Sequence, residues 1–123
     1  MANAVYFFDS YAIIEIILGN SNYKPYTKFN VVTTKLNIFE VYHGLLRDVG
    51  EMEAEEFLEE YYPHVIDFNE EDIRQATNFK VKNRQRNLSM SDCIGYVISK
   101  RLGIKFLTGD KEFKDFENVE FVK

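Results

Sequence analysis

The sequence predicts an α/β fold in which helices cover both faces of a parallel or mostly parallel sheet. Short apolar and β-branched runs alternate with longer segments in which apolar residues recur at helical spacing. Glycine, proline and asparagine separate these segments at positions that commonly end strands and helices. The chain has 123 residues and shows no repeat, low-complexity stretch or linker, so we expect one domain over residues 1–123.

The strands follow from short runs that favour an extended backbone. Residues 5–8 form an apolar run that stops at Asp9, and residues 31–34 are β-branched. Three further runs have the same character. Strands are therefore predicted at residues 5–8, 31–34, 64–68, 104–107 and 119–122.

The helices follow from apolar periodicity and from residues that begin or end helices. Gly50 and Gly103 each follow a periodic segment, and Asn69 followed by three acids is typical of a helix N-terminus. The segment 20–28 contains Pro25 and is expected to form a loop or a broken helix. Helices are predicted at residues 11–18, 35–49, 52–62, 70–86 and 89–102, with a helical turn at 111–116.

Composition predicts a cytoplasmic protein without a membrane partner. The single cysteine, Cys93, leaves no internal disulfide, and no Cys/His spacing suggests zinc. No stretch approaches the roughly 20 apolar residues that cross a bilayer. The N-terminus lacks the basic charge of a signal peptide.

Charge is distributed unevenly along the chain, whose formal net charge is −5. Residues 48–72 contain eleven acids and no lysine or arginine, whereas residues 73–91 contain five bases and no acid. The acidic run is typical of a solvated helix face. The net charge alone would discourage binding to a polyanion, so any such binding depends on the local basic stretch.

Two acids follow predicted strands. Asp9 comes directly after the first strand, and Asp110 comes shortly after the fourth. Ligands of parallel α/β sheets bind beyond the carboxyl ends of the strands, which makes both acids candidates for a site. Each also has a structural interpretation, Asp9 as an Asx-turn or helix N-cap and Asp110 as a turn residue that caps a helical turn.

Two further acids lie in predicted helices. Glu40 lies off the apolar seam of its helix, where a solvent-exposed side chain is the simpler interpretation, although Gly44 one turn later could clear space beside it. Asp92 lies three residues after Ser89, a spacing typical of a capping box. Gly95 again lies one turn later.

A cluster of these four carboxylates would have a specific chemistry. Neighbouring carboxylates raise one another's pKa values, and a hard divalent cation relieves their repulsion. Carboxylate oxygens suit Mg²⁺ or Mn²⁺, which commonly engage phosphates and activate water. The residues predicted to be catalytic and to bind metal in a phosphodiester hydrolase are Asp9, Glu40, Asp92 and Asp110.

The segments around these acids resemble the ordered motifs of PIN domains, and most closely those of the VapC-type toxins of toxin–antitoxin pairs. The motifs are Val5-Tyr-Phe-Phe-Asp-Ser10, Asn37-Ile-Phe-Glu-Val-Tyr-His-Gly-Leu45, Leu88-Ser-Met-Ser-Asp-Cys-Ile-Gly95 and Phe106-Leu-Thr-Gly-Asp-Lys-Glu-Phe113. The resemblance spans essentially the whole chain. Residues 20–30 are the one loop that does not align.

The resemblance implies a PIN-like fold with five parallel strands in the order 3-2-1-4-5, which places the first and fourth strands side by side. It also implies a Mg²⁺- or Mn²⁺-dependent endoribonuclease that forms a homodimer and has a cognate antitoxin partner. Ser10 and Thr108 match positions that orient the carboxylates. The positions that match metal ligands are Asp9, Asp92 and Asp110, with Glu40 as a ligand through water or to a second ion.

This resemblance suggests a role for the basic stretch at residues 80–86. Its distal end leads into the predicted helix that carries Asp92, so its cations could hold RNA phosphates that the acids repel. The alternative is a solvated helix end, where the helix dipole favours cations. The residues predicted to bind RNA are Lys80, Lys82, Arg84 and Arg86.

Two other functions remain open from the sequence. A phosphoaccepting, receiver-like signalling domain is also α/β and would use Asp67 and Thr108, but this chain lacks paired acids after the first strand. That function would also leave Glu40 and Asp92 without a role. A PIN-like binding module without turnover would keep the same fold, although four intact carboxylates favour an enzyme.

Overall fold

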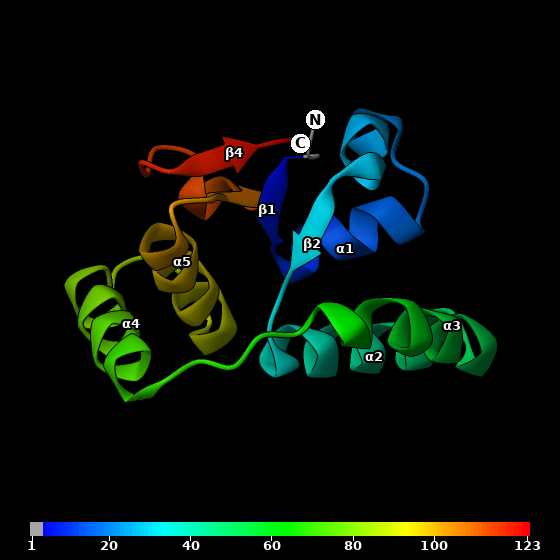
Figure 1. The fold of residues 1–123 in the computed structure, drawn as a ribbon, viewed down its shortest axis with the longest axis horizontal. Coiled ribbons are helices and arrows are strands. Elements are labelled where there is room, and N and C mark those ends of the chain that lie inside the picture. Colours follow the sequence, from blue (N-terminus) through cyan, green and yellow to red (C-terminus); the bar gives the residue numbers. More distant parts are fainter. Residues whose placement is uncertain (1–3) are drawn as a thin grey trace.

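The computed structural model describes residues 4–123, in which helices and strands alternate along most of the chain (Figure 1). The strands are β1 (Val5–Phe8), β2 (Asn30–Val32), β3 (Lys105–Thr108) and β4 (Val119–Phe121). The α-helices are α1 (Ser10–Ile17), α2 (Lys35–Asp48), α3 (Glu51–Tyr61), α4 (Glu70–Lys82) and α5 (Met90–Leu102). The 3-10 helices are η1 (Ser21–Lys28), η2 (Tyr62–His64) and η3 (Lys111–Phe113).

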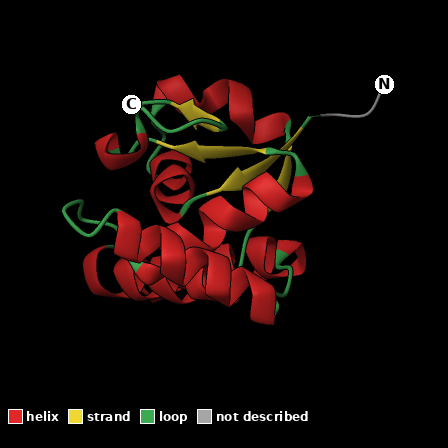
Figure 2. Ribbon diagram, turned by 90° about the vertical axis from the view of Figure 1, so that its left-hand side faces the viewer, coloured by secondary structure: helices red, strands yellow, loops and turns green. Residues whose placement is uncertain are grey.

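The four strands form one parallel sheet in the order β2-β1-β3-β4. The central strand β1 pairs with β2, where Phe7 lies opposite Val32, and with β3, where Phe8 lies opposite Leu107. Figure 2 shows the strands with helices on two sides. The predicted parallel α/β architecture is confirmed, and the acids that follow β1 and β3 leave the sheet from adjacent strands.

The prediction of five strands in the order 3-2-1-4-5 is wrong by one strand. Residues 64–68 make only an isolated bridge between Thr33 and Val65, in which the N–H of Ile66 donates to the carbonyl of Thr33 at 2.9 Å. The 3-10 helix η2 occupies the start of this segment, and Asn69 already caps α4. Too few residues remain between them for a longer ladder. The other strands keep the predicted order.

Helices cover both faces of the sheet because successive side chains of β1 point to opposite sides. Phe7 and Phe106 face one way and pack in a core with α4 and α5. Phe8 and Leu107 face the other way and pack with α1, α2 and α3. In Figure 1, α4 and α5 lie together on the left, and α2 and α3 lie together below the sheet. A strand buried on both faces needs apolar side chains at every position, which explains the composition of β1.

Helix α4 begins as predicted, with a capping box. The side chain of Asn69 accepts the N–H of Asp72 at 2.8 Å, and the carboxylate of Asp72 accepts the N–H of Asn69 at 3.0 Å. Arg101 near the end of α5 donates to both oxygens of Asp72, at 2.8 and 2.9 Å. Burial acts to raise the pKa of Asp72, but Arg101 and the backbone N–H of Asn69 outweigh it and hold that pKa below its ordinary value.

Helix α4 ends at Lys82, before the predicted end at residue 86. Asn83 donates its side-chain amide to the carbonyl of Phe79 at 2.8 Å, and its backbone leaves the helical conformation, with φ −113° and ψ 32°. The basic residues Arg84 and Arg86 therefore lie in the connection to α5. The segment predicted as a loop or a broken helix at 20–28 is the 3-10 helix η1.

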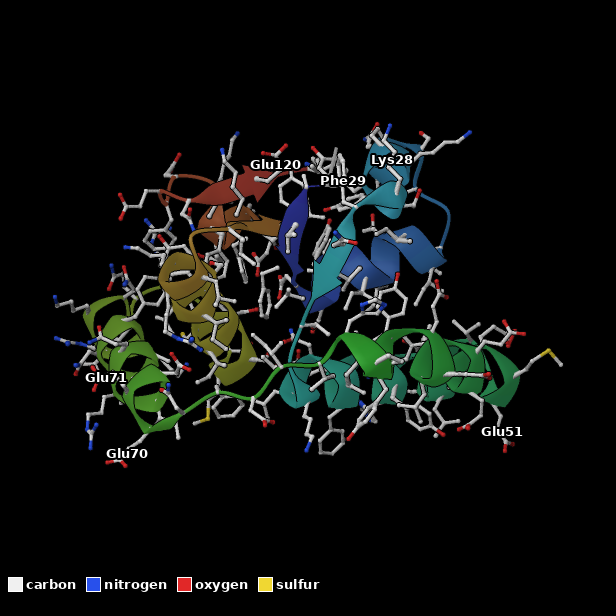
Figure 3. All side chains as sticks on the ribbon, in the orientation of Figure 1. Lys28, Phe29, Glu51, Glu70, Glu71 and Glu120 are labelled. Atoms are coloured by element: carbon white, nitrogen blue, oxygen red, sulfur yellow. The ribbon has the colours of Figure 1, made fainter. Side chains whose placement is uncertain are left out.

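The acids of residues 51–60 are mostly exposed, as the pattern of a solvated helix face predicts. Figure 3 shows Glu51 at the start of α3, and Glu70 and Glu71 at the start of α4, pointing away from the body of the molecule. Arg74 pairs with both Glu70 and Glu71. Among residues 4–123, no helix is long and apolar enough to cross a membrane.

Candidate active site

Asp9 directly follows β1 and is almost completely buried, with 2% of its surface exposed. Its Oδ2 accepts a hydrogen bond from the hydroxyl of Thr108 at 2.8 Å. Its Oδ1 is buried and has no hydrogen-bond partner within the described residues. Although Asp9 occupies the N-cap position of α1, its side chain makes no capping hydrogen bond. A capping role therefore does not explain why Asp9 is buried. A buried carboxylate oxygen without a hydrogen-bond partner is unfavourable, and a bound ligand such as a cation would relieve this cost.

Thr108 connects Asp9 to Asp110. Besides donating to Asp9, the hydroxyl of Thr108 accepts the backbone N–H of Asp110 at 3.1 Å. Asp110 uses Oδ1 to accept the N–H of Glu112 at 2.9 Å, so it caps η3 as its structural interpretation predicts. One buried threonine thus holds the acids that follow two adjacent strands.

Asp92 belongs to the capping box that begins α5. Its N–H donates to the hydroxyl of Ser89 at 3.1 Å, and its Oδ2 accepts the N–H of Ser89 at 2.9 Å. The predicted capping role is confirmed. It does not exclude a second role, because these contacts hold the carboxylate in one orientation at the end of the helix.

A chain of hydrogen bonds reaches Glu40 from the start of α2. The hydroxyl of Thr34 donates to Oδ1 of Asn37 at 2.7 Å, and Nδ2 of Asn37 donates to the hydroxyl of Ser10 at 3.0 Å. The hydroxyl of Ser10 in turn donates to Oε1 of Glu40 at 2.7 Å. Glu40 is exposed, yet this chain ties its carboxylate to Ser10, the residue that follows Asp9.

Asn37 belongs to this chain of hydrogen bonds, and the sequence motifs did not predict a role for it. It is fully buried, and it lies one turn before Val41 and two turns before Leu45 on the buried face of α2. An amide at a core position must find hydrogen-bond partners. That polar residue within an apolar helix face was the signal that could have identified it.

The predicted carboxylates share one electrostatic environment. Burial raises the pKa of Asp9 well above its ordinary value, and the charges of Asp92 and Glu40 raise it further, while Thr108 opposes them. Burial also raises the pKa of Asp92, and hydrogen bonds from Ser89 oppose this effect. The charges of Asp110 and Glu40 raise it as well. The fold therefore brings Asp92 and Glu40 near enough to Asp9, and Asp110 and Glu40 near enough to Asp92, to disfavour the ionised forms of Asp9 and Asp92.

The donor set fits a hard divalent cation. Between residues 4 and 123, no three His, Cys, Asp or Glu side chains already converge at distances that would hold a metal ion. A divalent cation among these acids would favour their ionised forms. The unpaired Oδ1 of Asp9 is one free oxygen ligand, and the neighbouring acids supply more oxygens of the type that Mg²⁺ and Mn²⁺ prefer.

The four residues predicted to bind RNA do not form one surface. Lys80, Arg84 and Arg86 line a hollow of about 570 Å³ between α4 and the start of α5. Lys82 lines a separate hollow on the other side of α4. The guanidinium of Arg86 also lies over the ring of Phe116, 4.5 Å from its centre. Any RNA contact through this stretch therefore involves Lys80, Arg84 and Arg86 on a different side from Lys82.

Comparison with protein families matches residues 6–119 to the PIN domain. No curated protein matches the chain. A toxin–antitoxin complex from Klebsiella pneumoniae has a TM-score of 0.77 at 13% identity, over 94% of this chain and 95% of that chain. VapC20 from Mycobacterium tuberculosis, a toxin that cleaves the sarcin–ricin loop, has a TM-score of 0.77 at 18% identity, over 98% and 100%.

A third structure, VapBC2 from Rickettsia felis bound to a fragment of promoter DNA, has a TM-score of 0.73 at 11% identity, over 97% of this chain and 99% of that chain. These identities are low, so the structural likeness concerns the fold. The family match is independent of them and covers β2, β3, the five α-helices and all four acids. On this evidence, the protein belongs to the PIN domain family.

Proposed function

We propose that this protein is a metal-dependent endoribonuclease that hydrolyses RNA phosphodiester bonds. The observation that carries the proposal is the buried Oδ1 of Asp9, which has no protein partner and lies among other acids. Such an oxygen is costly to bury in its ionised form unless a cation compensates the charge. Membership of the PIN family and a fold shared with a toxin that cleaves the sarcin–ricin loop support RNA as the substrate.

Each acid has a distinct part in the proposed site. Asp9, Asp92 and Asp110 would bind Mg²⁺ or Mn²⁺, and Glu40 would act through water or on a second ion. When bound, such an ion lowers the pKa of water and stabilises charge on a phosphate.

The chain's own contribution is orientation, because each acid is held by a neighbour. Thr108 fixes one oxygen of Asp9 and leaves the other free, and Ser10 fixes the carboxylate of Glu40. These hydrogen bonds restrict the two carboxylates before any ligand arrives, so less conformational entropy is lost on binding.

We further propose that the protein is the cytoplasmic toxin of a VapBC-type pair, built as one PIN domain over residues 1–123. The toxin–antitoxin complexes that share its fold support an antitoxin partner. We also propose that two copies of the protein form a homodimer. The cations that would hold RNA phosphates are Lys80, Lys82, Arg84 and Arg86, acting from the two sides of α4.

The test compares RNA cleavage by the wild type, Asp9→Asn and Asp92→Asn, with Mg²⁺ or Mn²⁺ and after chelation. Asp67→Asn is the matched control, because Asp67 is an exposed acid between the bridge at Val65 and α4. We expect cleavage by the wild type and by Asp67→Asn, and its loss in both other variants and with chelator. Thermal unfolding without metal checks that the variants remain folded.

Each alternative predicts a different result. Cleavage that persists in both Asp9→Asn and Asp92→Asn would refute the proposed site. No cleavage by the wild type, with RNA binding retained, would favour a binding module. Aspartyl phosphorylation that Asp67→Asn abolishes would favour the receiver-like function, which would contradict the proposal.

A further inference from the structure

We propose that a hollow beside Glu40 binds one base of the RNA, next to the phosphodiester bond that is cut. This inference rests on the proposed ribonuclease function. The hollow measures about 280 Å³ and lies between α2 and the start of α5. Its lining residues are Leu36, Phe39, Glu40, His43, Met90 and Ser91.

Two apolar side chains of this hollow are unusually exposed. Phe39 in α2 is 74% exposed, and Met90 at the start of α5 is 73% exposed. Phe39 immediately precedes Glu40, and Met90 lies two residues before Asp92. Unstacked RNA bases are commonly held on exposed aromatic side chains, because every base offers a flat apolar face. An aromatic ring on one helix and a thioether on the other suit a planar ligand between them.

Charge favours a base over a phosphate in this hollow. The carboxylate of Glu40 lines it and would repel a phosphate group, whereas a base is neutral. His43 also lines it and offers ring nitrogens for hydrogen bonds to the edge of a base, whereas Ser91 is buried and its hydroxyl pairs with that of Ser89 at 3.0 Å. An apolar face with a few polar groups at its side is the arrangement by which proteins recognise unpaired bases.

The hollow adjoins the proposed active site at Glu40, which lines it. The carboxylate of Glu40 accepts the hydroxyl of Ser10, which follows Asp9 in the chain. On its other side, the hollow shares Leu36 and Met90 with the larger hollow that carries three of the cations. An RNA strand lying across both would meet carboxylates, then a base-binding surface, then cations for its phosphates.

The experiment measures cleavage of a single-stranded RNA oligonucleotide whose cut site has first been mapped on RNA of random sequence. Phe39→Ala should raise KM about tenfold or more with little change in kcat, the expected effect of losing one base–aromatic stack. Phe39→Tyr should keep the wild-type KM. Met52→Ala and Tyr62→Ala are controls, because Met52 is 71% exposed and neither side chain lines the hollow.

An abasic substrate separates stacking from other effects. Replacing the base on one side of the cut with an abasic residue should raise KM for the wild type by a similar factor. Phe39→Ala should then have no further effect, because the stacking partner is already absent. The inference would be overturned if, on both sides of the cut, the increases in KM caused by Phe39→Ala and by the abasic residue multiplied as independent effects. An unchanged KM for Phe39→Ala on the intact oligonucleotide would overturn it as well.

The two proposals fail in different ways. If cleavage depends on Asp9 and Asp92 but is indifferent to Phe39, the base-binding hollow is refuted and the ribonuclease stands. If the wild type cleaves no RNA, the proposed function is refuted and the inference falls with it.

Discussion

Two helical glycines form a matched pair for substitution by alanine. In α5, a Cβ on Gly95 would lie 2.6 Å from one ring carbon of Phe7 and 3.0 Å from a ring carbon of Phe106. In α2, a Cβ on Gly44 would meet nothing within 4 Å outside its own helix. Gly95 therefore lets α5 pack closely on the sheet. The position of Gly44 suggested that it clears space beside Glu40, but a side chain at Gly44 would have room, so glycine is not needed there.

Alanine is expected to change the free energy of unfolding in opposite directions at Gly44 and Gly95. Alanine is more favourable than glycine within a helix by about 1 kcal/mol, so Gly44→Ala should raise the free energy of unfolding by about that amount. Gly95→Ala gains the same term but overpacks the core, which typically costs about 1–3 kcal/mol. Phe7 and Phe106 are fully buried with their ring centres 5.6 Å apart and have little room to move. We therefore take the upper end of that cost, about 3 kcal/mol, and after the gain of about 1 kcal/mol expect a net loss of about 2 kcal/mol.

The assay is urea unfolding followed by circular dichroism. With a denaturant slope of about 1–3 kcal/mol per molar urea for a small protein, the midpoint should rise by about 0.5 M for Gly44→Ala and fall by about 1 M for Gly95→Ala. Because Asp92 lies one turn before Gly95 in α5, RNA cleavage should also fall in Gly95→Ala. A Gly95→Ala protein as stable as the wild type would refute the packing argument.

Three further predictions concern residues that hold the site and the helices. Asn37→Ala breaks the chain from Thr34 to Ser10 and should cost about 1–3 kcal/mol in urea unfolding; it should also lower kcat, and unchanged kinetics would deny it a positioning role. Thr108→Val leaves Oδ2 of Asp9 without its donor and should weaken Mn²⁺ binding measured by calorimetry; wild-type affinity would contradict this. The pKa of Asp72 is lower in the folded protein than in the unfolded chain, where it is about 3.9. The ion pair of Asp72 therefore stabilises the folded protein at pH values above about 3.9, and this stabilisation is lost as the pH falls through the folded pKa. Asp72→Asn should thus be less stable than the wild type at pH 7, and a difference that persists at about pH 2 would contradict this linkage.

Local features of this fold were predictable because their causes lie within a few residues. The capping boxes at Asn69 and Ser89 and the left-handed Gly103 that ends α5 all occur where the sequence places them. The parallel arrangement also followed from the alternation of apolar runs and helical segments. The acids after β1 and β3 were identifiable because parallel strands present their carboxyl ends at one edge.

Other features depended on contacts that the sequence pattern did not reveal, some of them local and some with residues far along the chain. Residues 64–68 have the composition of a strand, but η2 and the cap of α4 leave too little of the segment to pair beyond one bridge. The end of α4 depends on the side chain of Asn83, which competes with the helical backbone. The role of Asn37 depends on Thr34 and on Ser10, a residue of a different helix.

The amino-acid sequence by itself determined the class of fold, the helix ends that carry caps, and the four acids to consider. Only the tertiary structure decided that Asp9 keeps one oxygen buried and unpaired, and that Asp92 and Glu40 lie near enough to raise its pKa. The physical reason is that capping depends on neighbours within about three residues. Burial and mutual repulsion depend instead on which strands and helices the folded chain places side by side.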